Sequence, residues 1–183
     1  MPTWLWIVIV VVAVIVVIAV VASVVRTKRS RALQESFGPE YDRVAADAPS
    51  RREAESELRE RQKRREELDI RPLEQSDRDR FSNRWRDVQA EFVDDPADAV
   101  VHADALIQEV MRARGYPVDD FDTRSADLSV DHPDLVEYYR AAHGIAVAHE
   151  RGNAGTEELR HAVQHYRRLF DELIGEREAE AAV

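Results

Sequence analysis

The sequence predicts an all-α protein with one membrane-spanning helix at its N-terminus. Two observations support this fold class. Residues 4–25 form an uncharged apolar run, and the rest of the chain carries apolar side chains at helical spacing between glycine and proline breaks. A length of 183 residues leaves room for one modest domain beside this segment. We therefore expect an anchor (1–25), a juxtamembrane basic segment with a charged spacer helix (26–71), a four-helix domain (72–175) and a frayed tail (176–183).

The apolar run from Trp4 to Val25 reads WLWIVIVVVAVIVVIAVVASVV. As a helix, its 22 residues measure about 33 Å, enough to cross a hydrocarbon core of about 30 Å. Its many β-branched residues would suit a strand in water, but an isolated strand in lipid leaves its backbone groups without partners. The alternative is a cleavable signal peptide, which needs a basic flank before a shorter apolar core. The sequence therefore favours a single-pass anchor.

Basic side chains follow this run, and none precedes it. The flank consists of Arg26, Lys28, Arg29 and Arg31. Because basic flanks stay on the cytoplasmic side, we expect a plasma-membrane protein with its N-terminus outside and its C-terminal domain in the cytoplasm. Trp4 and Trp6 would then lie at the outer interface, where indole rings are favoured. The basic flank is a stop-transfer signal that could also attract anionic lipid.

Charge is divided unevenly along the remainder of the chain. Residues 26–71 hold 13 Lys and Arg against 11 Asp and Glu, whereas residues 72–183 hold 13 against 25. The distal part is strongly acidic and would repel the phosphates of nucleic acid. The chain has no cysteine, which excludes disulfides, thiolate zinc sites and a cysteine nucleophile. We expect membrane lipid and a protein as partners, with no nucleic acid and no cofactor.

A helix break and a charged helix are predicted between the anchor and the distal domain. Gly38-Pro39 interrupts any helix that continues from the anchor, and a short helix covers about residues 40–46. A charged helix then runs from Asp47 or Ser50 to about Leu68. It is supported by Glu-before-Arg pairs at i,i+4: Glu55–Arg59, Glu57–Arg61 and Glu60–Arg64. Its poor apolar face favours a solvated spacer over a partner-binding helix.

Four amphipathic helices are predicted in the distal domain, each from an apolar stripe at helical spacing. They cover about residues 74–93, 96–114, 133–151 and 156–174. The stripe of the first helix consists of Phe81, Trp85, Val88 and Phe92. Asp95 with Pro96 opens the second helix, Gly115 closes it, and Thr156 caps the fourth. Two helical hairpins result, joined by a longer connection over residues 116–130.

Several short strings of the sequence resemble a known group of proteins. The strings are FGPEYDR (37–43), WRDVQAEFVDDP (85–96), RGYP (114–117) and ADLSVDHP (126–133). They are similar to an uncharacterised family of bacterial, largely actinobacterial, single-pass membrane-anchored helical proteins. The resemblance covers most of the chain after the anchor and implies the same architecture. Because that family has no assigned activity, no functional residue carries over.

Two histidines form the candidate metal site. His161 and His165 lie one helical turn apart, a spacing that can supply two ligands to zinc or a similar ion. No glutamate follows His161, so the metalloprotease pattern is absent. A third ligand would have to come from elsewhere in the chain, and His102, His143 and His149 are candidates that spacing alone does not decide between. The alternative interpretation is that both histidines simply border the core.

The connection after the second helix is rich in aspartate. The residues concerned are Asp119, Asp120, Asp122, Asp127, Asp131 and Asp134. Crowded carboxylates could bind calcium, but the spacing lacks the EF-hand pattern, and turn and N-cap roles explain most of these residues. Long connections often carry function. We therefore expect a docking loop here, with Tyr116, Phe121 and Asp122 as its contacts.

No motif in the sequence favours an enzyme. A P-loop, a dinucleotide fingerprint, a nucleophile elbow and the kinase motifs are all missing from the sequence. The leading hypothesis is a membrane-tethered interaction or scaffold protein with an acidic cytoplasmic helical domain. The alternative is a helical domain that binds a metal or small ligand, or catalyses a reaction, at His161 and His165.

Overall fold

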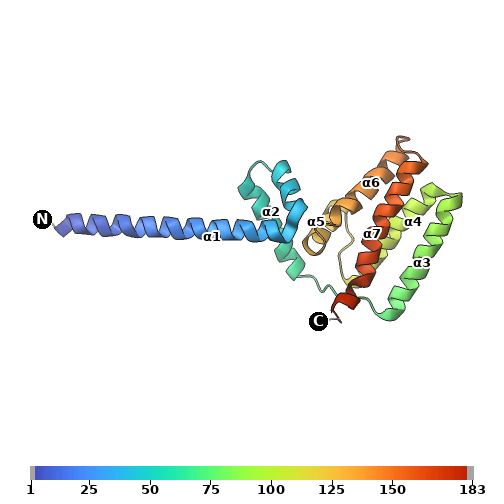
Figure 1. The fold of residues 1–183 in the computed structure, drawn as a ribbon, viewed down its shortest axis with the longest axis horizontal. Helices are drawn as coiled ribbons and strands as arrows, with labels where there is room; N and C mark the ends of the chain where they lie inside the picture. The colour runs from blue at the N-terminus through green and yellow to red at the C-terminus, as the bar shows by residue number, and fades with distance from the viewer. Residues whose placement is uncertain (1–2, 181–183) are drawn as a thin grey trace. The chain divides into compact units, whose positions relative to one another are not determined.

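The computed structural model describes the backbone of residues 3–180 and the side chains of residues 12–175. These residues form helices and no strand, which confirms the all-α fold class. The helices of the described chain are α1 (Thr3–Asp47), α2 (Arg51–Glu66), α3 (Gln75–Asp94), α4 (Pro96–Arg114), α5 (Phe121–Asp131), α6 (Val136–Glu150) and α7 (Thr156–Glu180) (Figure 1). The chain divides into two compact units, Met1–Leu58 and Arg59–Val183.

The predicted break in α1 is confirmed. Gly38 has φ 45° and ψ −125°, outside the helical region, and Pro39 follows it inside the same helix. A positive φ is open to glycine at little cost, and proline supplies no N–H for a helical hydrogen bond. The helix axis therefore changes direction at this pair.

The predicted anchor falls only partly within the described side chains. Across the part of the chain that the structure describes, no helix combines the length and apolarity that a membrane crossing needs. The predicted span begins at Trp4, and the side chains of residues 4–11, including those of Trp4 and Trp6, lie outside the described residues.

A polar cluster joins α2 to both parts of α1. Ser30 Oγ and the Tyr41 hydroxyl both donate to Glu55 Oε1, over 2.7 Å and 3.1 Å. Arg51 Nη2 donates to Ser30 Oγ over 2.9 Å. These hydrogen bonds hold the pKa of Glu55 below its usual value, and the bond from Ser30 has the largest effect. Glu55 thus pairs with Arg51, at 3.3 Å, and the expected pair with Arg59 is replaced.

The helix predicted as a solvated spacer has a buried face. Ser50 caps α2 by accepting from the Glu53 backbone N–H and donating to the Glu53 carboxylate, over 3.3 Å and 3.1 Å. Ala54 and Leu58 are fully buried, and Arg61 is 7% exposed. A helix that stands free in solvent would expose these residues. α2 is therefore not the fully solvated spacer helix that the sequence predicts.

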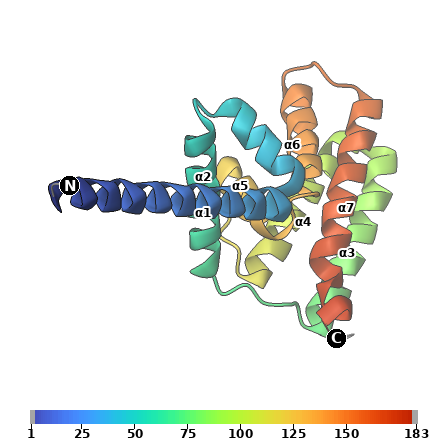
Figure 2. The same ribbon diagram turned by 60° about the vertical axis from the view of Figure 1, so that its left-hand side comes forward.

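The four helices predicted in the distal domain are all present. α3 packs against α4, α4 against α7 and α6 against α7, so these helices share one core (Figures 1 and 2). Each contributes fully buried large side chains, among them Trp85 of α3, Ile107 of α4, Tyr139 of α6 and Tyr166 of α7. The apolar stripes read from the sequence are therefore the faces that form this core.

The predicted ends of α4 are confirmed in detail. Asp95 accepts from the Asp98 backbone N–H over 3.1 Å, and Pro96 occupies the first turn. Gly115 closes the helix with φ 99°. A side chain there would be strained, and its Cβ would lie 2.2 Å from the Asp69 carbonyl oxygen. Glycine is required at this position for two separate reasons.

Three boundaries differ from those expected. Residues 121–131 form helix α5 within the segment predicted as a long connection. α7 does not end at Gly175 but continues to Glu180, and residues 181–183 of the predicted frayed tail lie outside the described residues. The distal compact unit starts at Arg59 instead of residue 72, so it includes the second half of α2.

Candidate functional site

An ionic cluster connects the second half of α2 to α5. Arg64 Nε lies 2.6 Å from Asp127 Oδ1, and Arg65 Nε lies 2.6 Å from Asp131 Oδ2. Asp127 is completely buried, whereas the Arg64 side chain is 43% exposed. A buried carboxylate is costly unless a cation or hydrogen-bond donors compensate it. These two pairs, one helical turn apart on α5, therefore fix that helix against α2.

Two hydroxyl groups extend this cluster. Arg61 Nη1 donates to Ser129 Oγ over 3.1 Å, and the Tyr116 hydroxyl donates to Asp131. Burial, and then the hydrogen bond to Asp131, raise the pKa of Tyr116 well above its usual range. The phenol therefore remains a protonated donor at neutral pH. The cluster holds α5 in place, a structural role that the sequence does not predict.

The composition of the buried face of α5 explains why the sequence does not predict this helix. That face consists of Arg124, Ser125, Asp127, Leu128 and Ser129. Only one of these residues is apolar, so a search for apolar periodicity finds no stripe. The available signal was the start of the helix, where Asp120 Oδ1 accepts from the Thr123 backbone N–H over 2.9 Å.

A buried cation and a buried histidine lie beside the cluster. Arg114 is 3% exposed and donates to the Leu173 carbonyl oxygen over 3.2 Å. His132 is 7% exposed, and its Nδ1 lies 4.0 Å from a Glu172 carboxylate oxygen. Burial, and then the charge of Arg114, lower the pKa of His132 below its ordinary value. The folded protein therefore favours the neutral imidazole.

Folding stability should consequently fall in mildly acidic solution because of His132. Its pKa is lower in the folded chain than in the unfolded chain, so the unfolded chain binds more protons below about pH 6.5. The free energy of unfolding should decrease as pH falls through this window. We expect urea unfolding of His132→Gln, followed by circular dichroism between neutral and mildly acidic pH, to show a shallower decrease than the parent chain.

His161→Gln is the matched control for this measurement, because the His161 side chain is exposed. Its stability should follow the parent curve. Identical slopes for the parent and His132→Gln would show that His132 does not cause the acid sensitivity.

The three residues of the predicted docking loop have different environments in the structure. Tyr116 is 2% exposed and belongs to the buried cluster, so it is unavailable as a docking contact. Phe121 lies in the first turn of α5 and stacks on His143, with ring centroids 3.7 Å apart. Asp122, on the same turn, is exposed. The segment from Phe121 is therefore helix α5 and not the expected loop, and a docking role for Phe121 and Asp122 stays a prediction.

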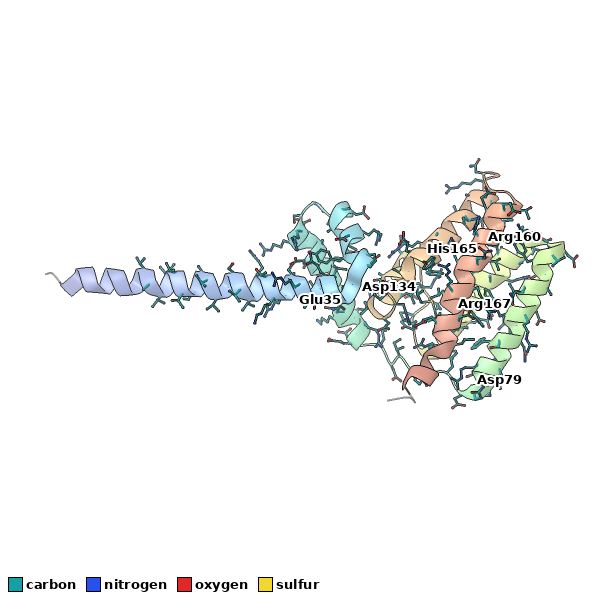
Figure 3. The ribbon with its side chains drawn as sticks, in the orientation of Figure 1. Glu35, Asp79, Asp134, Arg160, His165 and Arg167 are labelled. Carbon is teal, nitrogen blue, oxygen red and sulfur yellow. The ribbon has the colours of Figure 1, made fainter. Side chains whose placement is uncertain are left out.

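The two histidines proposed as metal ligands differ in environment. His161 is exposed, whereas His165 is half-buried, with its ring centroid 5.4 Å from that of Tyr138 (Figure 3). Burial, and then the charges of Arg168 and His161, lower the pKa of His165. The described side chains contain no group of three or more potential ligands around these residues or elsewhere.

The candidate third ligands have other partners. His102 Nδ1 contacts a Glu91 oxygen at 2.7 Å, His149 Nδ1 contacts the Ala154 carbonyl oxygen at 2.8 Å, and His143 stacks on Phe121. The structure therefore does not bring a third histidine to His161 and His165.

A surface groove between α3 and α4 is the strongest candidate site. It encloses about 400 Å³. Val88, Ala105 and Leu106 form its apolar part, and its charged lining consists of Arg84, Asp87, Glu91 and His102. The hydrogen bond that Glu91 accepts from His102 is the largest influence on this imidazole and raises its pKa. The groove thus combines an apolar surface with carboxylates, a composition suited to recognition.

Sequence reasoning missed this groove, although Asp87 and Glu91 stand one helical turn apart in the sequence. Their proximity to His102 depends on the antiparallel packing of α3 and α4.

Comparison with known proteins does not identify the chain: no family model, no curated protein and no solved structure matches it. The resemblance to a bacterial family of membrane-anchored helical proteins stays a prediction.

Proposed function

We propose that this protein is an interaction or scaffold protein that an N-terminal helix tethers to a membrane. One observation carries the proposal. The large apolar side chains between Val12 and Val25 are 39–62% exposed, and the described part of the chain does not cover them. A contiguous apolar surface of this kind is unfavourable in water and suits a lipid environment or another protein. Together with the uncharged residues from Trp4, it supports a single-pass anchor.

The basic flank supports the same proposal. α1 continues through the apolar run into four exposed basic residues, Arg26, Lys28, Arg29 and Arg31. Basic residues at one end of a span favour the cytoplasmic side and attract anionic headgroups. The acidic helical domain would then lie in the cytoplasm. Its surplus of carboxylates and its surface groove favour a protein partner over nucleic acid.

Charges placed inside the apolar run should release the protein from membranes. The parent chain, expressed in a bacterial host, should stay in the membrane pellet after high-salt and alkaline washes. Ile15→Arg combined with Ile18→Arg should move it to the soluble fraction, because each buried arginine costs about 2.5–3.5 kcal/mol at the centre of a span. Immunoblots of the washed fractions provide the measurement.

Ala32→Arg combined with Gln34→Arg is the matched control. It adds the same charge to exposed positions of α1 beyond the basic flank. This variant should remain in the pellet. A parent chain that washes off the membrane would contradict the tether. For the orientation, a cytoplasm-dependent reporter after Val183 should be active, and activity of a periplasm-dependent reporter there would contradict it.

A further inference from the structure

The end of the α3–α4 hairpin is more acidic than the domain as a whole. Residues 87–105, named here the acidic hairpin end, contain no lysine or arginine. Their carboxylates belong to Asp87, Glu91, Asp94, Asp95, Asp98 and Asp104. The groove between α3 and α4 lies largely within this segment. A ligand in the groove would therefore meet the carboxylates of Asp87 and Glu91, which line it from α3.

Some of these charges are already engaged and others are available. Glu91 contacts His102 at 2.7 Å, and Arg84, which lines the groove, is paired with Glu109. Asp87 is exposed, and it makes no hydrogen bond or ion pair with the residues that the structure describes. The net charge of these groups remains negative. An incoming cation can pair with Asp87 without displacing another partner.

Apolar groups lie beside these charges. The buried side chains of Val88 and Leu106 and the exposed Ala105 line the groove. Val101, one turn before Ala105 on α4, is 58% exposed. A fully hydrated cation would gain nothing from these side chains. A ligand that places an apolar group next to its positive charge would bury them.

We propose that this groove binds a cationic amphipathic segment of a partner protein. Asp87 and Glu91 stand one helical turn apart, so a segment with two basic residues one turn apart matches their spacing. An apolar side chain between those residues would contact Val88 and Ala105, which line the groove. The inference rests on the proposed interaction function and specifies the chemistry of its partner. Electrostatic complementarity gives such an interface its specificity and its association rate.

Binding of a designed peptide to the purified full chain in a mild non-ionic detergent tests the proposal. The probe is a fluorescent helical peptide of leucine and lysine, with lysines spaced three and four residues apart. We expect saturable binding by fluorescence anisotropy. Asp87→Lys combined with Glu91→Lys should weaken it about tenfold or more, since repulsion replaces two attractive pairs. Asp87→Lys alone should weaken it less, and Asp87 has no partner whose loss could unfold the hairpin.

Asp134→Lys combined with Glu137→Lys is the matched control, because it changes the net charge equally at two exposed positions outside α3 and α4. Asp134 is labelled in Figure 3, and Glu137 lies in the first turn of α6. It should bind nearly as well as the parent chain. Three results would each overturn the proposal: no saturable binding, equal weakening in both charge-reversal variants, or equal binding of a peptide with glutamate in place of lysine. Because the assay does not use membranes, its failure would leave the membrane-tether test unaffected.

Discussion

Trp85→Ala should destabilise the distal helical unit by about 3–5 kcal/mol, the range expected for removing a buried aromatic side chain. Trp85 is fully buried and stacks on Phe170, with ring centroids 4.7 Å apart and planes inclined by 22°. Arg167 covers the same ring at 5.7 Å. The substitution would leave a cavity between α3 and α7 and remove the aromatic contact. Urea unfolding followed by far-ultraviolet circular dichroism measures the loss.

Trp85→Phe should cost less than half as much. It keeps the stacked ring, and it removes an indole N–H that has no hydrogen-bond partner among the described residues. The matched control is Val93→Ala on the same helix, because Val93 is 81% exposed. That change should lie within about 0.5 kcal/mol of the parent stability. Equal losses for Trp85→Ala and Val93→Ala would contradict the assignment of Trp85 to the core.

Arg64→Ala should have the next largest effect, a loss of about 2–3 kcal/mol. It removes the cation from Asp127, which is completely buried and whose Oδ2 has no hydrogen-bond partner among the described residues. Breaking a fully buried pair costs about 3–5 kcal/mol. The smaller value is expected here because the Arg64 side chain is 43% exposed and solvent screens its charge. Urea unfolding of the single and double variants measures the effect.

The double variant distinguishes the ion pair from other roles of Arg64. Arg64→Ala combined with Asp127→Asn should recover most of the lost stability, because no uncompensated carboxylate then remains buried. Arg59→Ala is the matched control, since it removes an exposed arginine from the same helix. It should change stability by about 0.5 kcal/mol or less. Additive losses in the double variant would show that the two side chains do not interact.

The helices that the sequence predicted correctly have apolar buried faces. α3 is the clearest case, because Phe81, Trp85 and Val88 recur at helical spacing and are all buried. α4 has in addition a cap at Asp95 and a stop at Gly115, both of which are local signals. Such features depend on neighbours within a turn or two of the chain, so they are visible without tertiary information.

α5 and α2 show where sequence reasoning fails. The buried face of α5 is mostly polar. Burial of its carboxylates is possible because Arg64 and Arg65, on a helix some 60 residues earlier in the chain, form ion pairs with them. Conversely, the sequence of α2 is so polar that it resembles a solvated helix, yet Leu58 and Arg61 are buried. A charge pattern does not reveal which carboxylate compensates which cation, because that pairing is long-range.

The candidate sites divide in the same way. The pair His161 and His165 was visible from its spacing, but spacing could not show that one is exposed, that the other borders Tyr138, and that a third ligand is lacking among the described residues. The groove between α3 and α4 could not be predicted. It depends on the packing of two antiparallel helices that places His102 beside Glu91.

By itself, the sequence determined the helical class, the positions of the long helices, the break at Gly38 and the unequal distribution of charge. All of these follow from local periodicity, backbone preference and composition. Tertiary structure decided that the end of α2 belongs to the distal unit, that Tyr116 is buried and that a groove lies between α3 and α4. The physical reason is that burial and ion pairing depend on residues distant in the chain, which only packing brings within contact distance.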